Sequence, residues 1–169
     1  MRNEFGPLTA EQLNWKPAEK RWSIGQCLDH LITTHSLYFP LFGRLANGEW
    51  RPSLWAKVSP LSGFFGRFLI KGLDPANRKK MKTTRKAFPS SSDIDVGIVA
   101  RYVEHQHDMI DAIKRIPPTI DPRTTIITSP LLAAITYSLD DCYTILAEHG
   151  VRHFDQAKRV VESDGFPSK

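Results

Sequence analysis

The chain has 169 residues, of which 41% are hydrophobic and 24% are charged, and this composition excludes a wholly disordered protein. The length suits a single domain over residues 1–169 that buries a core without needing disulfides. No stretch approaches the ~18 uninterrupted apolar residues of a membrane span, and the first residues lack the apolar core of a signal peptide. A net charge of +5 permits an anionic partner but does not require one. The two cysteines, Cys27 and Cys142, are expected to be reduced core thiols in a cytoplasmic protein.

The first predicted long helix begins after Ser23. A serine here, with Gln26 three residues later, forms a capping box in which each side chain binds the other residue's backbone N–H. Pro40 should kink or end this helix, because it cannot donate a hydrogen bond to the carbonyl group of Ser36. Residues 8–13, which precede it, are expected to form at best a short helical turn. Apolar residues recur at helical spacing through the predicted helix: Ile24, Cys27, Leu28, Leu31, Tyr38 and Phe42.

Residues 46–91 are predicted to form a connecting segment that contains one short helix, over the apolar residues 63–70. Residues 78–86 are strongly basic and are predicted to form a loop. A basic stretch beside an apolar helix is compatible with binding to nucleic acid or to an anionic membrane surface. A solvated loop, beside a short helix that covers the core, accounts for the same residues, and we favour it because no nucleic-acid-binding motif accompanies the charge. The cations of this stretch are Arg67, Lys71, Arg78, Lys79, Lys80, Lys82, Arg85 and Lys86.

The second predicted long helix starts at Ser92, a candidate N-cap with Asp95 three residues later. It should end before Pro117 and Pro118, because neither proline can continue a helix. Its apolar residues define one predicted inward face: Val96, Val99, Val103, Ile110 and Ile113.

The third predicted long helix starts at Ser138 and runs to about Ser163, with Asp140 and Asp141 in the first turn, where carboxylates suit the helix dipole. Residues 129–132 resemble another short helical start. No segment alternates in the manner of a strand, so the predicted fold class is all-α, a helical bundle. One face of the third helix carries Leu139, Cys142, Leu146, His149, His153 and Val160.

His149 and His153 are the strongest candidates for a chemical function. Side chains four residues apart on a helix share one face, so both imidazole rings can reach one cation. The pair lies on the apolar face, where two buried rings need partners for their nitrogen atoms, and a metal ion would satisfy them. A pair of hydrogen-bonded core histidines is the alternative. His30, in the middle of the first long helix, favours the metal, because residues midway along two helices can meet across a bundle.

The remaining histidines are less informative. His105 and His107 are two residues apart and project to opposite sides of their helix, so both are predicted to lie at the surface or rim. His35 is predicted to be a core or interface histidine, and a contribution to the pocket is the less favoured alternative.

Three further residues are candidates for supporting or pocket positions: Gln26, Arg152 and Gln156. Gln156 follows His153 by three residues and can orient it, while Asp29 and Gln26 lie near His30. Arg152 can meet an anionic substrate, or it can pair at the surface with Glu148.

Three stretches resemble one known family. Residues 8–17, LTAEQLNWKP, and residues 22–31, WSIGQCLDHL, resemble the start of a DinB-like domain. Residues 149–156, HGVRHFDQ, resemble the second signature of that superfamily, which has a histidine, two residues, Arg-His, two residues and a glutamine. The resemblance extends from about residue 8 to residue 161. This superfamily is distinct from the similarly named DNA polymerase.

The resemblance implies a four-helix bundle that binds a divalent metal ion, often nickel, zinc or iron, through three histidines. By position these are His30, His149 and His153. Related proteins include S-transferases and isomerases that use bacillithiol, mycothiol or glutathione, and a proposed branch of metal-dependent hydrolases; dimers are common. The family usually has a long helix before residues 8–13, where this chain has only seven residues. The start is therefore truncated, or residues 60–72 or a partner subunit supply that helix.

These observations lead to two hypotheses. In the first, the protein is a metal-dependent thiol S-transferase or hydrolase that uses a low-molecular-weight thiol or water, with no nucleic acid as partner. In the second, it is a non-catalytic metal-binding or stress-response bundle. The sequence does not identify the metal or the substrate, because three imidazole groups accommodate several ions.

Overall fold

A computed structural model describes residues 1–74, 77, 88–89 and 93–168 of the chain. The predicted basic loop over residues 78–86 and the candidate cap Ser92 lie outside these described residues. None of the described helices has the length and apolar character needed to cross a membrane.

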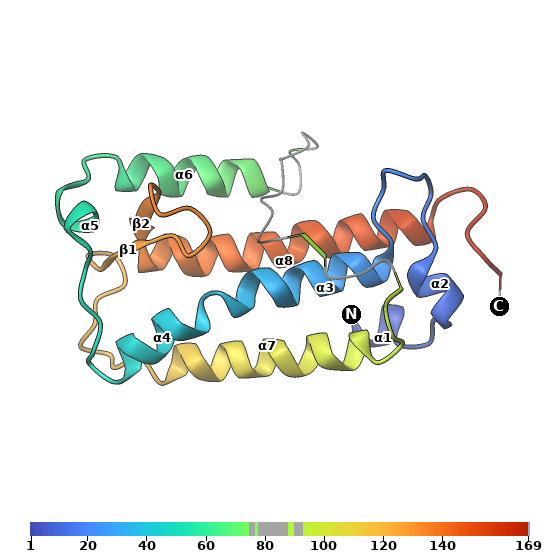
Figure 1. Cartoon of the computed structure of the whole chain (residues 1–169), viewed down its shortest axis with the longest axis horizontal. Coiled ribbons are helices and arrows are strands. Elements are labelled where there is room, and N and C mark those ends of the chain that lie inside the picture. Colours follow the sequence, from blue (N-terminus) through green and yellow to red (C-terminus); the bar gives the residue numbers. More distant parts are fainter. Residues whose placement is uncertain (75–76, 78–87, 90–92, 169) are drawn as a thin grey trace.

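The described part of the chain is mainly helical, with one small two-stranded sheet (Figure 1). The helices that frame the molecule are α3, α7 and α8, and α4 follows α3 after a short break. In chain order the elements are α1 (Arg2–Phe5), α2 (Ala10–Asn14), α3 (Ile24–Ser36), α4 (Phe39–Ala46), α5 (Leu54–Val58), α6 (Ser62–Leu73), α7 (Ile98–Lys114), β1 (Ile126–Thr128), β2 (Thr136–Ser138) and α8 (Leu139–Val161).

The starts of α3 and α8 confirm the predicted helix signals. Ser23 accepts a hydrogen bond from the N–H of Gln26, whose side chain accepts one from the N–H of Ser23. Ser138 and Asp141 form the same reciprocal pair at the start of α8. Pro40 lies in the first turn of α4, where it has no hydrogen bond to lose, so it opens a new helix after α3 has ended. These two capping boxes fix where the histidine-bearing helices begin.

The start of α7 differs from the prediction. The helix begins at Ile98 with Gly97 as its N-cap, and among the described residues no side chain caps it. Asp95 instead accepts hydrogen bonds from the N–H of Gly97, at 2.8 Å, and from the guanidinium of Arg101, at 2.9 Å. The carboxylate therefore stabilises the turn that enters the helix.

The inward face of α7 is also rotated from the predicted one. Val96 and Ile110 were expected to face inward, but they are 52% and 48% exposed. The true inward face is completed by small and polar residues, which an apolar pattern does not count. Its buried members are Ile98, Val99, Tyr102, His105, Met109 and Ala112.

The hairpin β1–β2 is a structure that the sequence pattern did not indicate. Its strands pair antiparallel, with Ile127 opposite Tyr137, and both side chains are buried. Each strand has three residues, too few for an alternating pattern to be recognised. Residues 129–132, predicted as a helical start, instead belong to the connection between the strands, where Ser129 accepts hydrogen bonds from the N–H groups of Leu131 and Leu132.

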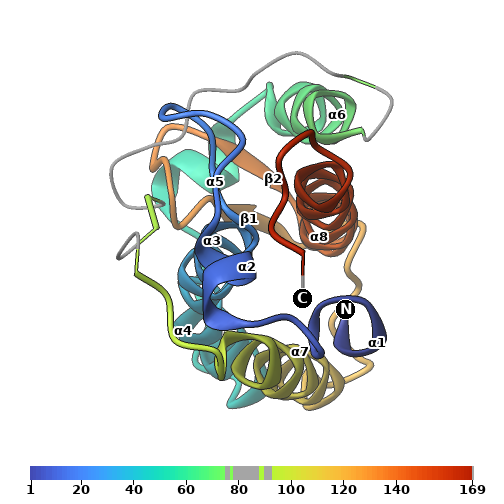
Figure 2. The same cartoon turned by 90° about the vertical axis from the view of Figure 1, so that its right-hand side faces the viewer.

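Seen from the end, α3, α7 and α8 surround the core, and α6 lies along α8 on the side away from α7 (Figure 2). Helix α6 confirms the predicted short helix and extends it. Gly66 allows α6 to approach α8 closely, because a Cβ at this position would collide with the side chain of Asp141 on α8. On the opposite side of α6, Phe64 and Phe68 stack on each other and are more than half exposed. Residues 62–73 thus add a helix to the side of the bundle. This placement is compatible with the alternative in which residues 60–72 supply the helix that the family usually has before residues 8–13.

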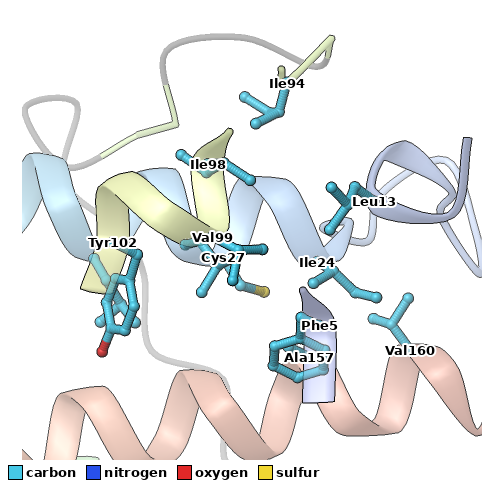
Figure 3. Packing of buried hydrophobic residues seen from close by; sticks show 12 residues of the cluster. Phe5, Leu13, Ile24, Cys27, Ile94, Ile98, Val99, Tyr102, Ala157 and Val160 are labelled. Atoms are coloured by element: carbon cyan, nitrogen blue, oxygen red, sulfur yellow. The ribbon is translucent and has the colours of Figure 1, made fainter. Parts of the chain in front are cut away.

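Two apolar clusters fill the core. The first joins α1, α2 and the start of α3 to the start of α7 and the end of α8 (Figure 3). The second joins α4, the end of α7, the hairpin and the start of α8. Cys27 lies in the first cluster and Cys142 in the second, both free and buried, and burial raises the pKa of Cys27 to about 12. Along α3 and α8, the layer between the two clusters is occupied by histidines.

Candidate metal centre

Three histidines meet in this middle layer: His30 from α3, and His149 and His153 from α8. One nitrogen from each ring lies within 4.8 Å of the others. The Nε2 atoms of His30 and His149 are 3.1 Å apart. The ring centroid of His153 is 4.6 Å from that of His30 and 4.7 Å from that of His149. The two helices therefore bring together side chains that are 119 residues apart in the sequence.

The donor set and its spacing fit a divalent transition metal ion. Nitrogen ligands of zinc lie about 2.0–2.1 Å from the ion, so two ligands at a tetrahedral angle are about 3.3 Å apart. The observed 3.1 Å between His30 and His149 is close to this spacing. His153 is buried, and its Nδ1 has no hydrogen-bond partner among the described residues. A buried polar atom without a partner is costly, and a bound ion would reduce that cost by giving the imidazole cluster a common partner.

The electrostatics of the cluster favour the neutral form of its two rings on α8, His149 and His153. Burial lowers the pKa of His153 to about 3; repulsion from a protonated His30 and from the charge of Arg152 adds to this effect, while a side-chain hydrogen bond with Gln156 opposes it. Burial also lowers the pKa of His149 well below its usual value. A neutral imidazole has a lone pair to offer, whereas a protonated one has none. The cluster is therefore able to accept a cation at neutral pH.

A comparison with models of known protein families shows which family the chain belongs to. A model of the DinB superfamily matches residues 1–157. The chain belongs to the DinB superfamily. No curated protein matches it. No solved structure matches it either.

Trp22 forms one wall of the cluster in this DinB domain. Its indole ring stacks on His153, with ring centroids 5.7 Å apart, and it also contacts His30 at 4.8 Å. Thr34, one turn after His30 on α3, has its Oγ1 3.4 Å from Nδ1 of that ring. The helical patterns of the sequence did not predict the contacts made by Trp22. Its position directly before the N-cap of a histidine-bearing helix was the available signal.

Of the other histidines, His107 and His35 lie where they were predicted, but His105 does not. His107 is exposed, as expected. His105 was expected at the surface or rim but is buried, and its Nε2 is 3.0 Å from Oγ of Ser36. This bond joins α7 to α3, which explains why a polar ring turns inward. His35 is a core histidine, as expected; burial lowers its pKa to about 3, and its Nε2 is 3.2 Å from Nδ1 of His149.

The predicted supporting residues have distinct positions in the DinB domain. Gln26 is used in the capping box that starts α3. Gln156 contributes the hydrogen bond to His153 described above. The guanidinium of Arg152 donates to the carbonyl oxygens of Gly72 at 3.3 Å and Asn77 at 2.7 Å. Arg152 therefore ties the end of α6 to the histidine-bearing helix α8.

Proposed function

We propose that this DinB domain binds a divalent transition metal ion through His30, His149 and His153, and that it acts as a metal-dependent thiol S-transferase or hydrolase. The observation that carries the proposal is the convergence of three imidazole groups from two helices in a buried layer. Three protein ligands leave coordination positions open, which is typical of catalytic rather than structural zinc sites. The ion is nickel, zinc or iron; three nitrogen ligands are compatible with each.

A divalent ion held in this way favours the deprotonated form of a thiol or of water, and so supplies a nucleophile at neutral pH. The residues of the chain set the conditions for that chemistry. Imidazole ligands carry no negative charge, so they leave the charge of an ion uncompensated and favour an anion beside it. Arg152 adds a positive charge that lowers the pKa values of His149 and His153. Trp22 covers His153 and limits the access of water to one side of the cluster.

Elemental analysis of the purified protein tests the metal site. We expect about one divalent ion per chain in the wild type and almost none in His149→Ala. The exposed His107→Ala is the matched control and should keep the metal of the wild type. Circular dichroism of each variant checks that the helices are retained. Equal metal content in wild type and His149→Ala would contradict the proposed ligands.

Turnover distinguishes an enzyme from the alternative, a non-catalytic metal-binding or stress-response bundle. An enzyme should couple a low-molecular-weight thiol to a model electrophile, or hydrolyse a model ester or amide, and His153→Ala should abolish this with the helices retained. The alternative predicts that a chelator lowers the thermal stability while no thiol or ester in the panel reacts. The absence of any turnover by the metal-loaded protein would favour the second function.

The proposal includes four further properties: one domain over residues 1–169, a low-molecular-weight thiol as co-substrate, a homodimer and a cytoplasmic location. The resemblance to the DinB-like superfamily, which includes thiol-dependent enzymes and in which dimers are common, supports the thiol and the dimer. Two buried, unpaired cysteines support a reducing compartment. Light scattering of the purified chain measures its mass in solution, and a monomer at micromolar concentration would contradict the dimer.

A further inference from the structure

His35 lies directly behind one of the proposed ligands. Its Nε2 is 3.2 Å from Nδ1 of His149, and the Nε2 of that same ring faces His30 at 3.1 Å. The two nitrogens of His149 therefore have different partners on opposite sides: His30 toward the cluster and His35 away from it. His35 is fully buried on α3, five residues after His30.

The position of one proton follows from this arrangement. A neutral imidazole carries its proton on one nitrogen and a lone pair on the other. If the proton of His149 is on Nδ1, it is donated to His35, and the lone pair of Nε2 faces the cluster. If the proton is on Nε2, it points into the cluster, and that nitrogen then has no lone pair with which to bind an ion. Which nitrogen carries the proton is set by the hydrogen bond that the other makes.

The position of His35 has a cost that a simple packing residue would avoid. To accept the proton of His149 at Nε2, a neutral His35 must carry its own proton on Nδ1. That Nδ1 is buried without a hydrogen-bond partner among the described residues. A leucine of similar size would fill the same space without this penalty. Packing alone therefore does not account for a histidine at this position.

We infer that His35 is a positioning residue, which holds His149 in the tautomer whose Nε2 lone pair faces His30 and His153. This inference rests on the proposed metal site for its function, but the tautomer itself does not require a metal ion. Without metal, the lone pair of His149 accepts the Nε2–H of His30, and Nδ1 of His30 accepts the hydroxyl of Thr34. On metal binding His30 changes tautomer, with its Nδ1–H donating to Thr34. The hydrogen bond from His149 to His35 is the same in both states.

Three variants separate positioning from packing. His35→Leu keeps the volume and removes the acceptor, whereas His35→Gln places an amide oxygen near the position of Nε2 and restores it. His105→Leu is the matched control, because His105 is also buried and its ring also bonds to a residue of another helix, Ser36, but this bond joins α7 to α3 and touches none of the proposed ligands. Urea unfolding in chelator measures how far the loss of a buried histidine changes the free energy of unfolding without metal. We expect this change to be comparable in His35→Leu and His105→Leu.

Two readouts test the inference. Competition for Zn²⁺ with a chromogenic chelator should show binding weakened about 10- to 100-fold in His35→Leu, largely restored in His35→Gln and unchanged in His105→Leu. Long-range ¹H–¹⁵N NMR of the metal-free protein should show the Nδ1–H tautomer of His149 in the wild type and a shift toward Nε2–H in His35→Leu. A wild-type chain that binds no Zn²⁺ would refute the metal site, and the NMR measurement would still decide the tautomer. Zn²⁺ binding by His35→Leu at wild-type strength, or an unchanged tautomer, would overturn the role of His35.

Discussion

The indole ring of Trp22 and the imidazole ring of His153 are nearly parallel, with an interplanar angle of 19° and ring centroids 5.7 Å apart. Trp22 precedes the N-cap of α3, while His153 lies on α8, so the contact closes one side of the histidine cluster between two helices. An aromatic ring in contact with a proposed ligand is also a natural reporter of what that ligand binds.

Trp22 should report metal binding through its fluorescence. Trp22 contacts both His30 and His153, so Ni²⁺ bound by these ligands would lie beside the indole ring and quench its emission. We expect Trp22→Phe to lose most of the Ni²⁺-dependent decrease while retaining the ion by elemental analysis. Trp55→Phe is the control, because Trp55 lies on α5, where its indole N–H donates to the carbonyl of Ala134. A full decrease in the Trp22→Phe protein would place the ion elsewhere.

The packing of α3 against the chain before α7 should be intolerant of an added methyl group at Gly25. A Cβ there would be 2.9 Å from Cβ of Ile94. Ile94 cannot shift readily, because its backbone donates to and accepts from the side chain of Asn14 at 2.7 Å and 2.8 Å. We expect Gly25→Ala to lower the free energy of unfolding by about 1–3 kcal/mol. Gly43→Ala, in α4 with open space around it, should leave stability unchanged or raise it by up to about 1 kcal/mol.

Urea unfolding of both glycine variants provides the measurement. A similar effect at both positions would mean that the lost flexibility of glycine, not the contact with Ile94, determines the result. Metal content should remain at the wild-type value in Gly43→Ala, since that residue lies beyond the histidine layer.

The three proposed ligands could be anticipated from sequence because each depends on local signals. The capping boxes at Ser23 and Ser138 fix the starts of α3 and α8, and helical spacing then places His30, His149 and His153 on inward faces. Residues midway along adjacent helices of a bundle are close whatever the details of the loops. The long separation in sequence therefore did not prevent the prediction.

The surroundings of the cluster could not be anticipated in the same way. Whether His105 faces inward depends on its bond to Ser36 from another helix, and no pattern within α7 contains that partner. The contact between His35 and His149 depends on the rotation of α3 relative to α8 within a few ångströms. The basic residues 78–86 lie outside the described part of the chain. Local periodicity predicts which residues face inward in general, but tertiary packing selects their partners.

The metal-free protein should lose stability steeply in acid. The pKa values of His35 and His153 are lowered to about 3 in the folded state, and that of His149 is also well below its usual value. In the unfolded chain these groups bind protons below about pH 6.5. Between about pH 6.5 and 3 the unfolded state therefore holds more protons, and the free energy of unfolding falls as the pH falls. Each such histidine adds a slope of up to about 1.4 kcal/mol per pH unit.

Chelator-treated protein unfolded in urea at several pH values measures this slope. His153→Leu should reduce it, because one buried titrating group is removed, while the exposed His107→Ala should leave it as in the wild type. Above pH 7 these histidines should contribute no slope. Stability that stays constant from pH 7 to pH 4 would show that the rings take up protons in the folded state over the same pH range as in the unfolded chain.

Replacing His153 with leucine should separate stability from metal binding. The imidazole ring is buried with its Nδ1 unpartnered, so a leucine of similar size removes a polar atom that is costly to bury and keeps an apolar contact with Trp22. In chelator we expect His153→Leu to be at least as stable as the wild type. With Zn²⁺ at a hundred times its dissociation constant the wild type should gain about 2.7 kcal/mol, and the variant should gain nothing, so that their order of stability reverses. Urea unfolding with and without Zn²⁺ gives all four values. An equal gain in both proteins would exclude His153 as a ligand, and a large loss of stability in chelator would show that its ring has a packing role that leucine cannot fill.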